Sequence, residues 1–195
     1  MPLVKDQAIC IRHWDWSETS QTVSLFARET GIVRCIAKGA KREKSNFSGG
    51  IELLTRGEMN ASIKSTEGLA LLTSWDLLET FSAARRSLSA FHAGMAILDI
   101  VQQAVQDADP HPGFFDAVLA SLRNLGSPQS DRGAVLAALW AALSETGHAP
   151  ELMRDVRGGS GGESVLPVAA VYPFFPALGG FSLVNGQNPP VEPTQ

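Results

Sequence analysis

The first 80 residues show apolar positions with a period of two. Short segments rich in β-branched and aromatic residues are separated by turn-forming residues, and strands are predicted at residues 8–14, 20–27, 31–38, 51–64 and 69–78. In the second and third segments the alternation places one apolar set on a single face: Val23, Leu25 and Ala27, then Val33, Cys35 and Ala37. Five short antiparallel strands predict a small closed barrel, and both an SH3-like barrel and the five-stranded OB-fold fit that count.

After residue 80 the apolar period changes to about 3.6, which is typical of amphipathic helices. A first helix is predicted over 84–106, with this apolar face: Leu88, Phe91, Met95, Leu98, Val101 and Val105. A second lies within 109–126, with this face: Phe115, Val118, Leu119 and Leu122. A third is expected to begin with Ser130 or Asp131 as N-cap and to end before Gly147. Three such helices predict a small bundle.

The chain changes again beyond Pro150. Residues 157–164 (RGGSGGES) read as a flexible connection, and the apolar stretch VLPVAAVYPFFPALGGFSLV predicts a hairpin or an apolar strap. The polar, proline-rich end (NGQNPPVEPTQ) is expected to be mobile. The predicted fold class is therefore α+β: an all-β domain at 1–80, a helical domain at 81–150, and a short C-terminal segment at 151–195.

Residue spacing supplies no active site. The four histidines are scattered, and GGSGG lacks the Lys-Ser/Thr of a phosphate-binding loop. Cys10 and Cys35 are the only cysteines and lie in predicted strands, so two reduced core thiols are favoured. No apolar run approaches the roughly 18 residues of a membrane span, and the start has no signal-peptide h-region. We expect a cytoplasmic protein that is not an enzyme and needs no cofactor.

Positive charge is concentrated in the stretch AKGAKREKSNFSGG, residues 37–50. Lys38, Lys41, Arg42 and Lys44 fall within seven positions against only Glu43, although the whole chain carries a formal charge of −4. Residues 1–80 hold ten cations and ten anions, so the acidic excess lies after residue 80. Distant charges are screened beyond about 8 Å at physiological salt, so a local patch can attract a phosphate backbone. The alternative is an ordinary solvated loop, and charge alone does not decide between them.

The order of residues closely resembles the N-terminal domain of the bacterial recombination mediator family RecO. Leu25 to Gly31 match its LF-x-R-E-x-G pattern, and Ala37 to Phe47 match A-K-G-A-R-R-x-K-S-x-F with Lys41 in place of arginine. WDLLETFSAARRSLSAF (75–91) resembles the exit from the family's barrel, and GHAPELMR (147–154) resembles the end of its helical domain. The resemblance covers residues 8 to about 157, and its specific part is 37–47.

The resemblance implies an OB-fold followed by a helical domain, with no known enzyme chemistry. Family members bind single- and double-stranded DNA, anneal complementary strands, and act with RecR to load RecA where single-strand-binding protein (SSB) coats the DNA. They also contact the C-terminal tail of SSB, and this role implies association with the nucleoid. The residues expected to contact phosphate are Lys38, Lys41, Arg42 and Lys44, with Arg34 and Arg56 as weaker candidates. For Phe47, Trp14 and Trp16, core packing is favoured over base stacking.

One departure from the family pattern concerns zinc. Many members carry two C-x-x-C pairs after the A-P-x-L segment, where this chain has Asp155 and Gly158, and then, in a loose alignment, Leu183 and Gly186. No cysteine follows Cys35, so a four-thiolate site is chemically impossible here. The hypothesis is that the segment is a degenerate zinc module in which an aromatic strap is buried against the helices: Tyr172, Phe174, Phe175, Phe181 and Leu183.

Two further functions remain as alternatives. The chain could be a protein-interaction adaptor of the same pathway that binds RecR or the SSB tail without useful DNA affinity. The acidic, apolar SSB tail would need a groove beside a cation, for which Arg85, Arg86 and Arg123 are candidates. An RNA-binding OB protein of translation is disfavoured because the helical segment and GHAPEL match the mediator family.

Overall fold

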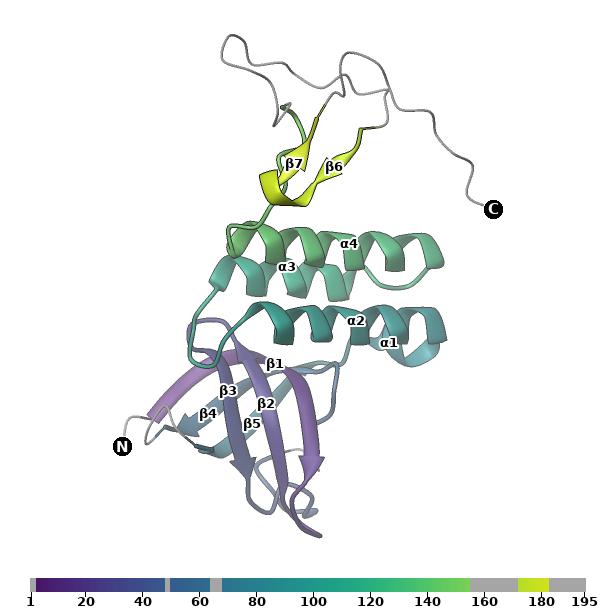
Figure 1. The fold of residues 1–195 in the computed structure, drawn as a ribbon. Coiled ribbons are helices and arrows are strands. Elements are labelled where there is room, and N and C mark those ends of the chain that lie inside the picture. The colour runs from purple at the N-terminus through teal and green to yellow at the C-terminus, as the bar shows by residue number, and fades with distance from the viewer. Residues whose placement is uncertain (1–2, 48–49, 64–67, 155–171, 183–195) are drawn as a thin grey trace. The chain divides into compact units, whose positions relative to one another are not determined.

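The computed structural model describes residues 3–47, 50–63, 68–154 and 172–182, in two compact units, Met1–Glu145 and Thr146–Gln195. The first unit starts with five strands, followed by four helices (Figure 1). The strands are β1 (Leu3–Asp15), β2 (Gln21–Ala27), β3 (Gly31–Ala37), β4 (Arg56–Ser62) and β5 (Ala70–Glu79). The helices are α1 (Ser82–Arg86), α2 (Leu88–Ala104), α3 (Pro112–Arg123) and α4 (Pro128–Glu145). None of the described helices is long and apolar enough to cross a membrane.

The strands form a closed barrel in the order β1-β2-β3-β5-β4, with β4 pairing back onto β1. All pairs are antiparallel except β3 with β5, which run parallel. This five-stranded order is that of the OB-fold rather than an SH3-like barrel. The predicted α+β class, an OB-fold barrel followed by helices, is confirmed.

The predicted strand at 51–64 is wrong in its first part, because β4 begins only at Arg56. Leu54 has a left-handed backbone (φ 55°), and the hydroxyl of Thr55 donates to the carbonyl of Glu52 at 2.6 Å. These features make a turn rather than a strand. Ile51 is nevertheless fully buried, and its amide donates to Gln21 Oε1 at 3.0 Å. The apolar residues of this segment therefore pack as a loop.

Two of the strands are buried on both faces. The alternating set predicted on β2 and β3 fills the barrel interior, as expected, together with Trp75 and Met59. The other face of β1 and β2 packs on the helices through Ile9, Ile11 and Phe26. Strands buried on both faces read as near-continuous apolar runs. The shared outer core therefore joins the barrel to the helical layer.

The predicted helix at 84–106 is two helices that break at Ser87. The backbone there is extended (φ −133°), and the Ser87 hydroxyl caps α2 by accepting from the amide of Ala90 at 3.4 Å. The buried face of α2 is Ala90, Ala93, Gly94, Ile97, Leu98 and Val101. The side chains of Leu88 and Phe91 are 71% and 43% exposed, so their assignment to the apolar core face is wrong. Both residues lie within α2, outside the face that its buried residues form.

Helix α3 begins at Pro112 and buries Phe114, Phe115, Val118 and Leu122, close to the prediction. Helix α4 begins at Pro128, so the N-cap predicted at Ser130 or Asp131 is wrong. Asp131 is instead a buried residue of the first turn, accepting from the Gly126 amide at 2.9 Å and the Ser89 hydroxyl at 2.7 Å. Gly147 is left-handed (φ 73°) after the helix end, as expected for a C′ residue.

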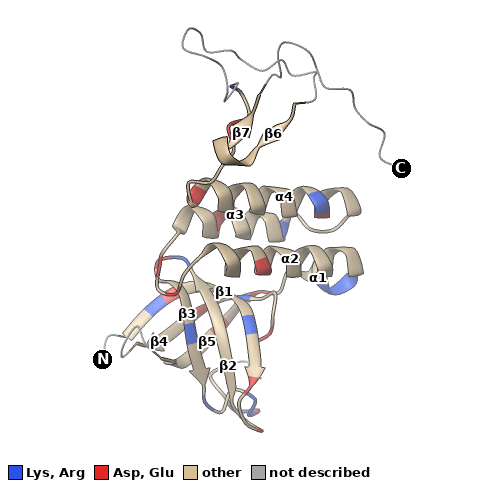
Figure 2. Cartoon of the chain, in the orientation of Figure 1, with Lys and Arg blue, Asp and Glu red and all other residues tan. Residues whose placement is uncertain are grey.

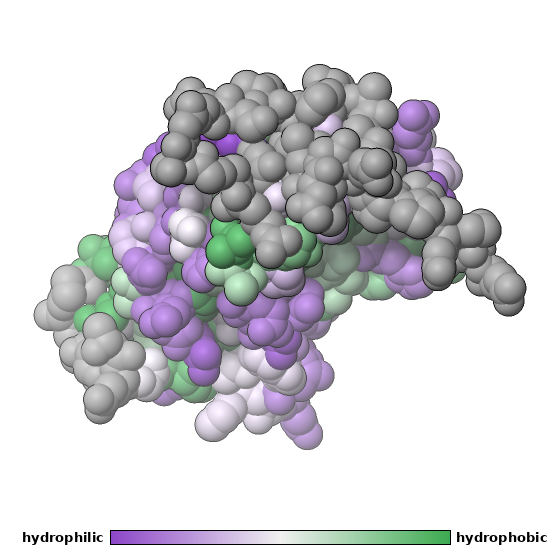
Figure 3. All heavy atoms as spheres, turned by 45° about the horizontal axis from the view of Figure 1, so that its top comes forward, coloured by the Kyte–Doolittle hydropathy of each residue, from purple (hydrophilic) through white to green (hydrophobic). Residues whose placement is uncertain are grey.

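Helix α4 departs from the amphipathic pattern predicted for the bundle. It packs inward with Ala134, Ala138 and Ala142, whereas these larger apolar side chains are exposed: Leu136, Leu139 and Trp140. Small residues allow close approach to α2 and α3. In the space-filling view, hydrophobic residues reach the surface in separate patches among hydrophilic ones (Figure 3).

The described part of the second unit is a small hairpin. Strands β6 (Phe174–Phe175) and β7 (Gly180–Phe181) pair around a short 3-10 turn, and the Phe174 and Phe181 rings lie 5.2 Å apart. The Glu151 amide donates to the carbonyl of Gly179 at 2.8 Å. The predicted hairpin is thus present, but the burial expected for the aromatic strap is wrong: Phe174 is 47% exposed, and Tyr172, Phe175 and Phe181 are only partly buried. Asp155, Gly158, Leu183 and Gly186 lie outside the described residues.

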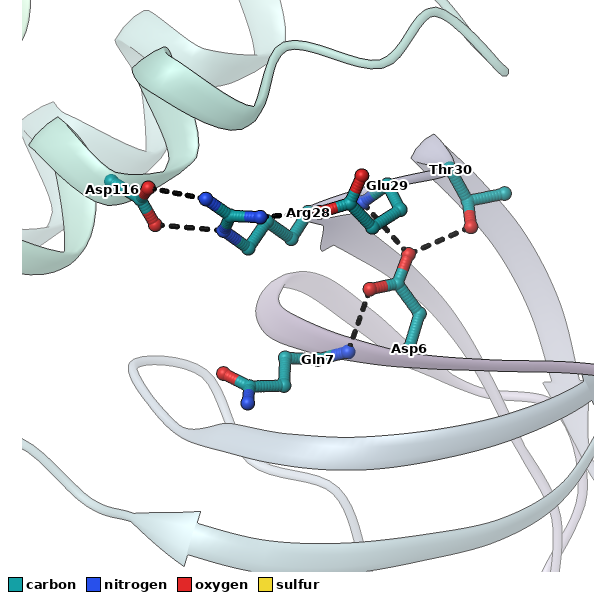
Figure 4. A network of polar contacts seen from close by, with 6 residues as sticks. All are labelled: Asp6, Gln7, Arg28, Glu29, Thr30 and Asp116. Carbon is teal, nitrogen blue, oxygen red and sulfur yellow. Dashed lines mark hydrogen bonds and ion pairs between the residues drawn. The ribbon is translucent and has the colours of Figure 1, made fainter.

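Polar contacts fix the barrel to the helices in addition to the apolar core. Arg28, at the β2–β3 turn, makes a bidentate contact with Asp116 of α3 at 3.0 and 2.7 Å, and also contacts Glu29 (Figure 4). The carboxylate of Asp6 holds the same turn by accepting from the Glu29 amide at 2.9 Å and the Thr30 hydroxyl at 2.7 Å. The turn is therefore held from the barrel side and from the helix side.

A second set of polar contacts between the barrel and the helices lies at the end of β5, around Glu79. The Glu79 carboxylate accepts from Arg123 of α3 at 2.8 to 3.1 Å and from Arg56 of β4 at 3.3 Å. The hydrogen bonds from Arg123 are the main cause that lowers the pKa of Glu79 below its usual 4.5, with a smaller contribution from Arg56. The Glu79 side chain is 26% exposed.

Replacing Phe26 by alanine should lower the free energy of unfolding by about 3 to 5 kcal/mol, because the cavity would lie between the barrel and α3. Chemical denaturation followed by circular dichroism measures this change. Phe91→Ala is the matched control: its ring is 43% exposed, so the loss should be about 0.5 kcal/mol. Equal losses for the two variants would contradict the shared core.

The lowered pKa of Glu79 predicts that the stability of the protein depends on pH. A carboxylate whose pKa is lowered by folding stabilises the folded state above its unfolded pKa, and this contribution is lost as pH falls through the folded value. Unfolding free energies measured between neutral pH and pH 3 should therefore fall less steeply below about 4.5 for Glu79→Gln than for the wild type. Glu18→Gln, at an exposed turn position, should keep the wild-type slope. An unchanged slope for Glu79→Gln would contradict this.

Candidate nucleic-acid interface

The basic loop leaves β3 at the end of the barrel opposite the helices (Figure 1). We define the basic loop as residues 38–47, all of which the structure describes. It packs on the β1–β2 turn: the Gly39 amide donates to the Ser20 hydroxyl and the Lys41 amide to the Thr19 carbonyl, both at 3.1 Å. Gly39 is left-handed (φ 70°), a conformation that glycine adopts without strain.

Buried residues give the basic loop a defined shape. Ala40 and Phe47 are 0% and 5% exposed and belong to the barrel core. The carbonyl of Ala40 accepts from the Ser45 hydroxyl at 3.1 Å, and the carbonyl of Asn46 accepts from the amide of Trp75 at 2.9 Å. Because its apolar residues point inward, the loop presents its charged residues to solvent. Phe47 is a core residue, as favoured from sequence.

Three of the four loop cations are exposed and have no ionic partner among the described residues. Lys38, Arg42 and Lys44 are exposed, and within the described ranges none lies within 4.0 Å of a carboxylate. Lys41 differs, since its Nζ lies 2.5 Å from the Asp15 carboxylate at the end of β1 and its side chain is 31% exposed. The structure thus brings the four cations together and neutralises one of them.

The two weaker candidates lie elsewhere, in ion pairs. Arg34 Nε contacts Asp107 at 3.0 Å, beyond the end of α2. Arg56 contacts Glu79, donates to Gln7 Oε1 at 2.9 Å, and has a side chain only 15% exposed. Both therefore lie where the barrel meets the helices. Figure 2 shows other Lys and Arg residues at the far end of the barrel.

Two shallow grooves of about 370 and 400 Å³ border the basic loop and share Lys38, Gly39 and Arg42. The larger one continues along Lys44 and the start of β5 at Leu71. The smaller one is bordered by Trp16, whose side chain is 63% exposed. Trp14 is also exposed, at 51%, but borders a different groove, between β1 and α2. The core packing favoured for both tryptophans is therefore wrong.

Other groups proposed from sequence have structural contacts. Arg123 binds Glu79, and Arg85 donates to the carbonyls of Thr80 and Leu53, both at 3.2 Å. Arg86 is exposed at the end of α1. No group of three or more His, Cys, Asp or Glu side chains in the described ranges could hold a metal ion.

The two thiols are structural residues of the barrel core. Cys10 and Cys35 are free and buried. Burial raises the pKa of both thiols, that of Cys35 to about 12. A zinc site of the four-thiolate kind does not fit this chain, because these are its only cysteines and thiolates are disfavoured where they lie.

Comparisons with known proteins agree with this architecture. The family model described as "Recombination protein O N terminal" matches residues 1–81, and "Recombination protein O C terminal" matches residues 85–172. Similar proteins include the DNA repair protein RecO of Rhodopirellula baltica, 35% identical over 147 residues, and that of Salinibacter ruber, 29% identical over 175 residues. A third is the DNA repair protein RecO of Cutibacterium acnes, 29% identical over 196 residues.

These alignments cover 75%, 88% and 97% of this chain and 54%, 67% and 76% of the respective relatives. The chain thus spans about half the length of the Rhodopirellula baltica protein. The two family models together account for the OB-fold barrel and for the helices that follow it. The chain belongs to the RecO family of DNA repair proteins.

Proposed function

We propose that this RecO-family protein binds single- and double-stranded DNA through its basic loop and acts as a mediator of homologous recombination. The observation that carries the proposal is the set of three exposed, unneutralised cations, Lys38, Arg42 and Lys44, on a loop of defined shape. Cations along a shallow groove are the usual means of following a phosphate backbone without sequence preference. Grooves of about 370 and 400 Å³ border these side chains.

Strand annealing follows from the same charges. Two complementary strands repel each other through their phosphates, and lysine and arginine side chains lower that repulsion while the strands find register. The step makes and breaks no covalent bond, so its rate depends on charge and on access to the bases. In this proposal the protein promotes annealing, acts with RecR, and helps to load RecA onto DNA coated with SSB.

A second function, an adaptor that binds RecR or the SSB tail alone, is supported by a different surface. Helix α4 exposes Leu136, Leu139 and Trp140, and exposed apolar side chains are common at protein interfaces. Arg132, on the same helix, is also exposed. This function would need neither the basic loop nor its grooves, so removing the loop cations separates the two proposals.

The variant Lys38→Ala/Arg42→Ala/Lys44→Ala should flatten the dependence of DNA affinity on salt. Each phosphate contact contributes about 0.7 to the log–log slope for single strands, so the slope should fall by about 2. The measurement is a salt titration of binding to labelled single-stranded DNA. Lys41 is left intact because it is paired with Asp15.

The matched control is Arg85→Ala/Arg86→Ala/Arg132→Ala, which removes the same charge from exposed positions outside the loop that have no ion pair with a described carboxylate. Its slope should stay within about 0.5 of the wild-type value, since these residues would contact no phosphate. If both variants flattened the salt dependence of DNA affinity equally, that affinity would depend on net charge and not on the basic loop. Absence of DNA binding by the wild type would contradict the proposal and favour the adaptor.

A further inference from the structure

The β1–β2 turn places an exposed tryptophan beside the loop cations. The Trp16 amide donates to the Ser20 carbonyl at 2.9 Å, and the Ser20 amide donates to the Ser17 hydroxyl at 3.2 Å. The backbone that carries Trp16 is therefore fixed by its own turn, and this turn supports the basic loop through Ser20 and Gly39. The ring remains 63% exposed.

Trp16, Lys38 and Arg42 border one groove of about 370 Å³, with Ile36 also in its lining. This volume is within the range of pockets that hold small organic ligands, roughly 300 to 1,000 Å³. An aromatic side chain beside cations is the combination with which OB-folds bind unpaired strands: the ring stacks on a base and the cations contact the phosphates. The turn between the first two strands is also one of the two loops that OB-folds use for oligonucleotides.

We infer that Trp16 is a base-stacking residue that makes this site prefer single-stranded over double-stranded DNA. The inference rests on the DNA-binding function proposed above and adds a residue that determines strand selectivity. In a duplex each base face is covered by its neighbours, so the ring has no face on which to stack. The cations contact phosphates in both forms of DNA, whereas Trp16 contributes binding energy with unpaired bases only.

Trp14 provides a matched control for Trp16. It lies two residues earlier, is 51% exposed, and borders the groove between β1 and α2 together with Met95 and Asp99. None of the four loop cations lines that groove. If an exposed tryptophan contributed only nonspecific hydrophobic contact with DNA, replacing Trp14 or Trp16 by alanine would weaken DNA binding equally.

The test compares Trp16→Ala, Trp16→Phe and Trp14→Ala with the wild type, using a labelled single strand and the duplex of the same length. Stacking on one base is worth about 1 to 3 kcal/mol, so Trp16→Ala should weaken single-strand binding by about 5- to 150-fold. Its duplex affinity and its salt slope should stay unchanged. Trp16→Phe should recover most of the lost affinity, and Trp14→Ala should bind like the wild type.

Other results would overturn the inference. Equal weakening of single-strand and duplex binding by Trp16→Ala would assign the ring a general role, and no weakening would remove it from the site. If the triple loop variant flattens the salt slope while Trp16→Ala binds normally, DNA binding by the loop stands and the stacking role fails. If the wild type binds neither DNA, both proposals fail. Unchanged thermal unfolding of Trp16→Ala checks that the loss is not one of folding.

Discussion

The packing of Phe26 against α3 is the contact on which the rest of the first unit depends. Its ring lies 5.7 Å from that of Phe114 and 5.5 Å from that of Phe115, and all three side chains are buried. Phe26 points out of the barrel, so the outer face of β2 is part of the core that includes the helices. The barrel wall is thus buried on both sides along β1 and β2. The opposite end of the barrel carries the basic loop.

This shared core also explains where the charges lie. Three arginines of the barrel strands and turns contact carboxylates of the helical region: Arg12 with Asp99 at 3.8 Å, Arg28 with Asp116 at 2.7 Å and Arg34 with Asp107 at 3.0 Å. The acidic excess after residue 80 is therefore placed against the cations nearest the helices. Within the described ranges, the loop cations at the far end contact no carboxylate of the helical region, and only Lys41 has an ionic partner, Asp15 of β1. An acidic chain can in this way keep a local cationic surface.

Much of the fold could be predicted from the sequence, whereas several features of the candidate site could not. The alternation of apolar residues in β2 and β3 predicted which side chains fill the barrel interior, and the 3.6-residue period predicted the helical region. Both patterns arise because apolar side chains face the core. The exposure of Leu88 and Phe91 could not be predicted, because the side of α2 that is buried is set by its packing in the shared core and not by its apolar residues alone. The split of the cations into paired and unpaired sets depends on long-range contacts, Arg34 with Asp107 and Arg56 with Glu79. Exposure of Trp16 depends on the shape of a five-residue turn, which periodicity does not report.

Native-state hydrogen exchange tests the shared core most directly. If the barrel and the helices are one cooperative unit, the most protected amides of β2 and α3 should exchange with the same free energy and the same dependence on denaturant. That result would show that the barrel opens only when the helical layer does. Exchange of α3 at a clearly lower free energy, with β2 still protected, would contradict the account, because the helices would then unfold from an intact barrel.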